Sequence, residues 1–336
     1  MGLHTPIEPP RPPHAFGAEI LDLRHFSSHH LRPLLDRESH VWARMMAWDY
    51  RASADMILRY IDSKILPGYA AVYNERIGGY AFFVYEGSKG VIGDLYADGS
   101  IPLMGGESIE HRLAAHVIDT LQRSPGVQRI EAQLLLHEAS AISRPFILEG
   151  FRQFTRLFMM LPLLPHEEII RPEPRITPLP GFEFRHWSEQ DFQAVAGVIT
   201  TSYRGHIDSE INDQYRSVNG SLRFLNNIVR FPGCGIFDSG ASFVAVHKRT
   251  RSVAGLLLCS RVRDDVGHVT QVCVLPELRG HRIGESLIGL CTQELRRRNF
   301  SGLSLTVTEA NEGAVGLYRR LGFDVCRCFD AFVWES

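Results

Sequence analysis

The sequence has no excess of charge of either sign. Its 336 residues hold 36 Lys and Arg against 38 Asp and Glu, a formal net charge of −2 at pH 7. The isoelectric point of about 6.7 is well below the value of roughly 9 that a nucleic-acid footprint usually gives. The composition therefore argues against a nucleic-acid partner, and 10% of aromatic residues argues against a disordered chain.

Long hydrophobic runs are also missing. No apolar stretch approaches the roughly 20 residues that cross a bilayer, and the nearest, 157–164, is interrupted by Pro162. The N-terminus lacks the basic and apolar regions of a secretory signal, and Pro6 stands where a myristoylation motif requires Ser or Thr. We therefore expect a cytoplasmic protein without a membrane partner.

Cysteine is scarce and confined to the second half of the chain. Such a chain is neither a small disulfide scaffold nor a zinc protein with paired cysteines, so we expect buried free thiols. The three histidines His25, His29 and His30 have helical spacing but no matching carboxylate or cysteine, and we expect them on the surface without a metal. The six cysteines are Cys234, Cys259, Cys273, Cys291, Cys326 and Cys328.

Proline is concentrated where the chain divides. Six prolines lie between Pro162 and Pro180, and proline removes backbone donors and disfavours helix in the residue before it. An extended connector is expected there. The predicted organisation is a flexible tail at 1–14, a first domain at 15–165, a linker at 166–180 and a second domain at 181–336.

The second half predicts a mixed α/β sheet with the element order β-α-α-β-β-β-α-β-α-β-β. The expected strands cover 182–185, 242–247, 253–261, 266–274 and 303–307, with closing strands over 323–334. The expected helices cover 188–202 and 221–229, a long segment from about residue 283, and 313–321.

The first half repeats this order weakly. Ala71-Val72-Tyr73 followed by Ile77-Gly78-Gly79 parallels 245–247 followed by 253–255, and 130–135 parallels 303–307. The matches keep their order at an offset of roughly 160–175 residues, about one domain length. The sequence therefore predicts an internal duplication, that is, two tandem α/β domains.

The segment 272–286 carries the clearest chemical signal. A strand ends at Pro276, and a loop with Gly280 leads directly into a helix near Gly284. Unpaired amides at a helix N-terminus bind phosphates, glycine lets the backbone approach a ligand, and Arg279 and Arg282 add forked cationic donors. These features indicate a pyrophosphate site, although the Gly-Lys-Ser/Thr and Gly-x-Gly-x-x-Gly fingerprints are absent.

The segment resembles the signature of the GNAT (Gcn5-related N-acetyltransferase) superfamily, Arg/Gln-x-x-Gly-x-Gly/Ala after a strand ending Val-x-Pro. Arg279, Ile283 and Gly284 fit, whereas Arg282 replaces the middle glycine. We expect this change to be tolerated if Arg282 points to solvent or phosphate and its backbone stays helical. Residues 311–323 resemble the second signature, Asn-x-x-Ala-x-x-Leu-Tyr-x-x-x-Gly-Phe. The likeness covers roughly 181–336. It implies tandem acyl-CoA N-acyltransferase-like domains.

The resemblance implies acetyl-CoA as cosubstrate, without a metal. A sheet that opens beside its fourth strand would bind the pantetheine arm along Val272–Val274, and amides from Gly280 to Glu285 would bind the pyrophosphate. Asn311 would contact the pantetheine region. The implied binding residues are Val272, Cys273, Val274, Arg279, Gly280, His281, Arg282, Ile283, Gly284, Glu285 and Asn311.

The resemblance also implies that an amine attacks the thioester directly. Tyr318 matches the family's usual acid for the leaving thiolate. The family's fifth-strand glutamate is replaced by Thr306, which cannot act as a base. The fourth-strand position falls on His268, which alternation places on one face with Thr270 and Val272, and Glu309 is the fallback base.

The acceptor side is expected in the segment 203–215, where Tyr203, His206 and Asp208 are the candidate substrate-binding residues. The expected function is transfer of an acetyl group to a primary amine of a small molecule or peptide. A non-catalytic acyl-CoA sensor and a tRNA-dependent aminoacyl transferase are the alternatives, and a homodimer remains open.

The first half lacks the corresponding motifs. After its expected fourth strand at 91–96 there is no Arg-x-x-Gly-x-Gly, and before Gly150-Phe151 there is no Asn and no Leu-Tyr pair. We therefore expect a degenerate first copy that has lost CoA binding.

Overall fold

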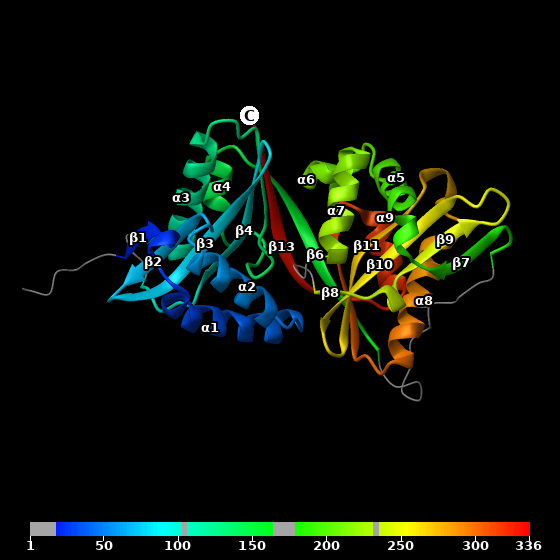
Figure 1. Cartoon of the computed structure of the whole chain (residues 1–336), viewed down its shortest axis with the longest axis horizontal. Helices are drawn as coiled ribbons and strands as arrows, with labels where there is room; N and C mark the ends of the chain where they lie inside the picture. The colour runs from blue at the N-terminus through cyan, green and yellow to red at the C-terminus, as the bar shows by residue number, and fades with distance from the viewer. Residues whose placement is uncertain (1–17, 103–105, 164–178, 231–234) are drawn as a thin grey trace, which may run out of the picture.

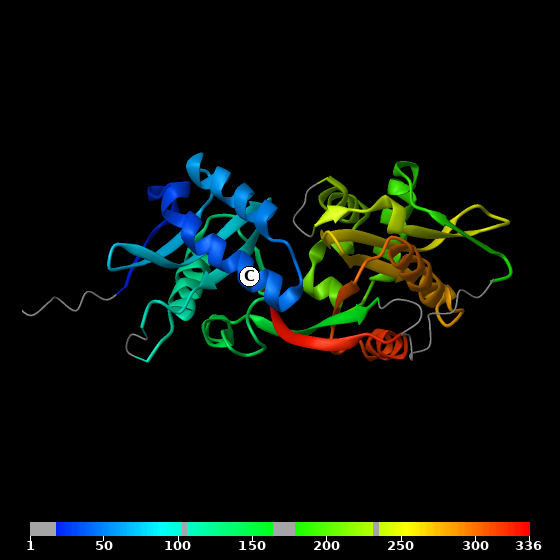
Figure 2. The same cartoon turned by 90° about the horizontal axis from the view of Figure 1, so that it is seen from below.

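A computed structural model describes residues 18–102, 106–163, 179–230 and 235–336. The predicted tail at 1–14 and most of the predicted linker at 166–180 lie outside these ranges. Two lobes stand beside each other, and the strands β6 and β13 lie between them (Figures 1 and 2). We refer to the elements up to β6 as the N-terminal copy and to those from β7 as the C-terminal copy.

The described residues of the N-terminal copy form six strands and four α-helices. Its strands are β1 (Glu19–Asp22), β2 (Gly68–Tyr73), β3 (Arg76–Glu86), β4 (Lys89–Ala97), β5 (Arg129–Gln133) and β6 (Arg152–Pro162). Its helices are α1 (Ser28–Met46), α2 (Arg51–Asp62), α3 (Ile109–Arg123) and α4 (Ser143–Leu148). The helices α1 and α2 bury their apolar faces against one side of the sheet and α3 against the other.

The C-terminal copy repeats this order. Its strands are β7 (Phe182–His186), β8 (Ile236–Phe237), β9 (Phe243–His247), β10 (Val253–Arg263), β11 (Val266–Val274), β12 (Gly302–Thr308) and β13 (Asp324–Glu335). Its helices are α5 (Phe192–Ser202), α6 (Asp208–Ile211), α7 (Val218–Arg230), α8 (Ile283–Arg297) and α9 (Glu312–Arg320). The predicted duplication therefore appears as two runs of the same elements, with 71–73 on β2 and 245–247 on β9.

All strands except β8 follow one path through a single mixed sheet, in the order β1-β2-β3-β4-β5-β13-β6-β12-β11-β10-β9-β7. The two copies exchange their last strands in this order. The strand β13 of the C-terminal copy pairs with β5, and β6 of the N-terminal copy pairs with β12, while β6 and β13 pair with each other. The exchange places side chains of each copy inside the other copy's half of the sheet.

The strand β10 shows how the sequence determines the centre of this sheet. Its residues Val253–Ser260 are all buried, because α8 covers one face and α5 the other. A continuous apolar run is the expected pattern for a strand buried on both faces.

Three sequence-based expectations need correction. Residues 323–334 form one long strand rather than several, and the one-turn helix α6 was not foreseen. Cys326 is exposed, in the exposed first residues of β13, and Cys328 is half-buried, whereas Cys259, Cys273 and Cys291 are buried free thiols. Cys234 lies outside the described residues.

His25, His29 and His30 are exposed. Within the described ranges, no group of three or more His, Cys, Asp or Glu is arranged to hold a metal ion. No helix in that same part of the chain has the length and apolar character of a membrane span.

Candidate active site

The sheet opens between β11 and β12. These parallel strands pair only over Val266–Val269 and Gly302–Leu305, after which each continues with a partner on its other side. A register shift in the pairing of β11 with β10 leaves Thr270 without a partner residue at the point of separation. Such a bulge bends a strand, and here it turns residues 271–274 away from β12.

A cavity of about 540 Å³ occupies this opening. It is bounded by β11 and β12, by the N-terminal turn of α8, by α9, and by the segment that joins α5 to α6. The predicted residues on its wall are Tyr203, His206, Asp208, Val272, Cys273, Val274, Arg279, Gly280, Arg282, Ile283, Gly284, Glu285, Asn311 and Tyr318. Residues from four separate parts of the sequence are thus brought to one place.

The N-terminus of α8 faces this cavity. Arg282 is the N-cap residue, and its side chain caps none of the helix amides. Its backbone is left-handed, with φ of 61° and ψ of 14°, and Gly280 has φ of 80°. The right-handed helical backbone given above as a condition for tolerating Arg282 is therefore not present. Arg282 occupies, at a steric cost, the conformation that glycine adopts freely at this position in the motif.

Arg279 fixes this loop to the rest of the domain. Its Nη2 donates to the Ser202 carbonyl oxygen at 2.7 Å, at the end of α5. His281 is exposed, with its Nδ1 3.1 Å from the Arg279 carbonyl oxygen, and it does not line the cavity. The loop presents the first-turn amides of α8 and the positive end of its dipole, which suits a pyrophosphate.

Tyr318 lies on α9 at the inner wall and is only 7% exposed. Burial, and then the nearby Asp208 carboxylate and Cys273, raise the pKa of its phenol above the ordinary value. The phenol consequently keeps its proton at neutral pH and can act as a hydrogen-bond or proton donor. Asn311 caps α9, since its Oδ1 accepts from the Ala314 amide at 3.3 Å.

Asp208 begins α6 and lines the cavity. The hydroxyl of Thr308 donates to its Oδ1, and the Nδ1 of His206 lies 3.4 Å from its Oδ2. Arg156, from β6 of the N-terminal copy, approaches Oδ1 at 3.8 Å. The Asp208 charge also contributes to raising the pKa of Tyr203 and Tyr215, after burial, so a carboxylate and an imidazole stand beside three phenols.

His268 lies outside the cavity. It is buried, and it contacts the ring of Trp48, at 4.9 Å between centroids, and that of Phe158. Its Nδ1 is 2.9 Å from Ser304 Oγ. The expectation that it shares a face with Val272 is wrong, because the bulge at Thr270 shifts the alternation by one residue. Val272 packs toward α8, whereas His268 packs toward the N-terminal copy.

Glu309 is exposed, follows β12 and does not line the cavity. Several wall residues were not foreseen, among them Gln271, whose Oε1 accepts from the Tyr203 hydroxyl at 3.2 Å. No local signal in the sequence marks Gln271, because its direction depends on the bulge.

The N-terminal copy keeps the framework without the motif. Its strands β4 and β5 also pair over only four residues, and a register shift at Gly93 precedes the separation. In this copy Leu95 of β4 corresponds to Val272 of β11. The Nε2 of His137 lies 2.7 Å from the Leu95 carbonyl oxygen. The segment after β5 thus contacts the strand edge that the other copy leaves open to its cavity.

A mixed sheet that opens at a bulged fourth strand, with a helix N-terminus at the mouth and a tyrosine inside, defines a GNAT-type acyltransferase domain. Residues 209–323 match the family model described as Acetyltransferase (GNAT) family. Residues 209–323 of the C-terminal copy therefore form a GNAT acetyltransferase domain.

Individual relatives agree with this family. The mycothiol acetyltransferase of Thermobifida fusca (strain YX) is 35% identical over 109 residues, which are 30% of this chain and 31% of that protein. The likeness thus spans less than a third of the relative's length.

Solved structures share the fold of the whole chain. A GCN5-related N-acetyltransferase from Sphaerobacter thermophilus superposes with a TM-score of 0.60 at 18% identity, over 88% of this chain and 91% of that one. A tandem GNAT protein from the clavulanic acid biosynthesis pathway gives 0.57 at 15% identity, over 95% and 98%. At these identities the likeness concerns the fold alone.

Proposed function

We propose that the C-terminal copy transfers the acetyl group of acetyl-CoA to a primary amine of a small molecule or peptide by direct attack. The observation that carries this proposal is the meeting of the open β11 edge, the α8 N-terminus and Tyr318 in one cavity. The residues fit the donor. The α8 turn suits the pyrophosphate, and the backbone edge of residues 272–274, which does not pair with β12, suits an extended pantetheine amide chain.

The acceptor amine enters on the side of His206 and Asp208. The amine nitrogen forms a bond to the thioester carbonyl carbon and gives its proton to the His206 imidazole, whose Nδ1 faces Asp208 Oδ2. The carbon–sulfur bond then breaks, and the CoA thiolate takes the Tyr318 proton. This assignment replaces His268 and Glu309, neither of which reaches the cavity.

A direct experiment follows the reaction itself. The full chain is incubated with acetyl-CoA and a panel of a polyamine, an amino sugar and a lysine-containing peptide. Released thiol and acetylated product are measured, the latter by mass spectrometry. We expect at least one amine to be acetylated. If none of the panel is acetylated while acetyl-CoA binds, the transfer proposal fails.

A non-catalytic acyl-CoA sensor is the second candidate. Thr306 replaces the glutamate of the family's fifth strand, and its Oγ1 accepts from Arg156 Nη2 at 3.4 Å rather than standing free for an amine. Binding of acetyl-CoA without turnover of any amine supports this candidate.

A further inference from the structure

The short helix α6 is held by the N-terminal copy. It is a single turn, Asp208–Ile211, and an isolated turn of this length is not stable in water. Its first residue, Asp208, faces the cavity, and its last carbonyls point away from it. Four residues of α-helix span only about 6 Å, so the position of one end determines that of the other.

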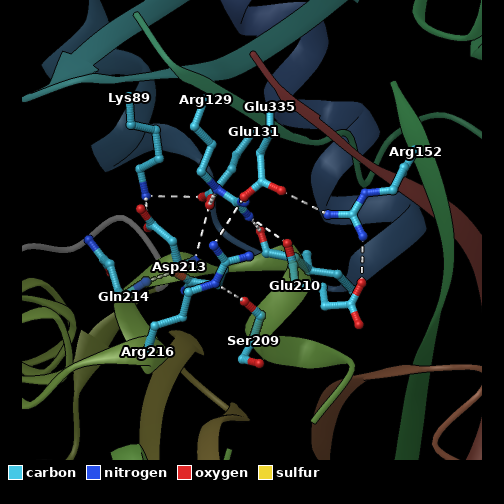
Figure 3. Close-up of polar contacts among 12 residues, drawn as sticks. Lys89, Arg129, Glu131, Arg152, Ser209, Glu210, Asp213, Gln214, Arg216 and Glu335 are labelled. Atoms are coloured by element: carbon cyan, nitrogen blue, oxygen red, sulfur yellow. Dashed lines mark hydrogen bonds and ion pairs between the residues drawn. The ribbon is translucent and has the colours of Figure 1, made fainter. Parts of the chain in front are cut away.

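Arg129 on β5 binds the far end of this turn (Figure 3). Its Nη2 donates to the carbonyl oxygens of Glu210 and, at 3.3 Å, of Ile211. Its Nε donates to Glu131 Oε1 at 2.6 Å, and its Nη1 pairs with Glu335 of β13. The side chain of Arg129 is only 7% exposed, so both the guanidinium and the carbonyls it binds are shielded from water.

The residues after α6 are held by the neighbouring strand. Lys89 on β4 is the register partner of Arg129, and its Nζ binds Asp213 at 2.7 Å and Glu131 at 3.1 Å. The same Glu131 carboxylate accepts the Asp213 backbone amide at 3.1 Å. Although burial opposes it, the surrounding carboxylates raise the pKa of Lys89, so its charge is retained.

None of these N-terminal side chains lines the acetyl-CoA cavity. We infer that Arg129, with Lys89 and Glu131, is a positioning group that holds α6 so that Asp208 and His206 meet the acceptor amine. The inference rests on the proposed function, and it gives the degenerate copy a role in catalysis without a ligand of its own.

Arg129→Gln tests this role with two independent readouts. We expect faster hydrogen exchange of the amides 209–213, with exchange of β11 unchanged. With the fastest amine of the panel, kcat/KM should fall at least about ten-fold, since small misplacements of a reacting group are costly. The Kd of acetyl-CoA should stay unchanged, because the α8 turn is untouched. Arg129→Lys keeps the positive charge but lacks the forked guanidinium donors. Its kcat/KM should lie between that of Arg129→Gln and that of the natural protein.

A double-mutant cycle with Asp208→Asn separates positioning from general damage. If Arg129 acts through Asp208, adding Arg129→Gln to Asp208→Asn should lower kcat/KM little further than Asp208→Asn alone. The matched control is Arg123→Gln on α3, because Arg123 is exposed and pairs only with Asp119 four residues earlier. If Arg129→Gln does not fold, Asp213→Asn is the substitute variant. It removes the carboxylate that pairs with Lys89 on the C-terminal copy, at a half-buried position.

Unchanged exchange of 209–213 in a folded variant overturns the inference, as do fully additive losses in the cycle. If the natural protein acetylates no amine, the proposed function fails by itself. The hydrogen-exchange measurement then still decides whether Arg129 holds α6.

Discussion

His268 is a buried imidazole that lies outside the cavity, although the sequence predicts it as the general base. Burial, and then the nearby Arg156 cation, lower its pKa to about 3. In the unfolded chain the pKa returns to about 6.5, so the unfolded state binds the extra proton. The stability associated with neutral His268 is therefore complete above pH 6.5. It is lost as the pH falls from about 6.5 toward 3, at about 1.4 kcal/mol per pH unit.

His268→Asn removes this titration and can keep the hydrogen bond to Ser304. We expect the free energy of unfolding of the natural protein to fall more steeply below pH 6.5 than that of the variant, by about one proton's slope. Urea unfolding at pH 7, 6 and 5 measures the difference. Equal slopes would contradict a buried neutral imidazole. Acetyl transfer at pH 7 should persist in the variant, because His268 does not reach the cavity.

Tyr318→Phe removes the proton donor and little else, because the ring remains in the core beside Phe323. We expect kcat to fall by roughly 10²-fold, the usual contribution of a positioned acid, with the Kd of acetyl-CoA unchanged. Thiol release at saturating acetyl-CoA measures the effect. Turnover equal to that of the natural protein would remove the acid role.

The residues whose place on the cavity wall could be predicted from the sequence are those that belong to one local segment. Arg279, Gly280 and residues 282–285 line the cavity from one loop and one helix turn, and Tyr318 lies seven residues after Asn311 on α9, so linear spacing carries the information. The base was not predictable in this way. Its assignment depends on the bulge at Thr270 and on the short helix α6, which is held by residues from the other half of the chain.

At the scale of the element, the entry into α8 is strained at Arg282. A non-glycine residue with φ of 61° costs about 1–2 kcal/mol, and a β-branched side chain there is worse. The family signature has glycine at this position. The conformation of the turn is thus retained here although the residue has changed.

Arg282→Gly and Arg282→Val form a matched pair at this turn. We expect the glycine variant to keep the free energy of unfolding within about 1 kcal/mol, because relief of strain offsets the greater freedom of the unfolded chain. The valine variant should lose about 1–3 kcal/mol. Chemical unfolding of both variants measures the difference, and equal stabilities would contradict the left-handed conformation.

At the scale of the whole molecule, the exchanged strands tie the two copies together. The sequence predicts the order of elements and the repeat, because strand and helix patterns are local. The partner of a strand is not a local property. The alternation of buried and exposed residues in β6 and β13 predicts that both are strands. The same alternation is expected whether each strand pairs within its own copy or within the other copy.

Separate expression of residues 1–165 and 166–336 tests the exchange of β6 and β13 between the copies. Each piece alone leaves a central strand without its neighbour, β5 without β13 or β12 without β6, and exposes a long hydrophobic edge. We expect each piece to aggregate and the co-expressed pair to elute as one stable complex in size-exclusion chromatography. Two monomeric folded pieces would show that the exchange is dispensable.

The exchange of β6 and β13 also bears on how such a chain can evolve. Once a duplicated gene encodes copies that complete each other's sheets, deletion of the degenerate copy removes a strand from the working one. Natural selection can then erase the ligand-binding motif of the N-terminal copy, but it cannot shorten the gene by that copy. A half that lacks the phosphate-binding motif is thereby retained, and its surface is free to acquire roles at the neighbouring site.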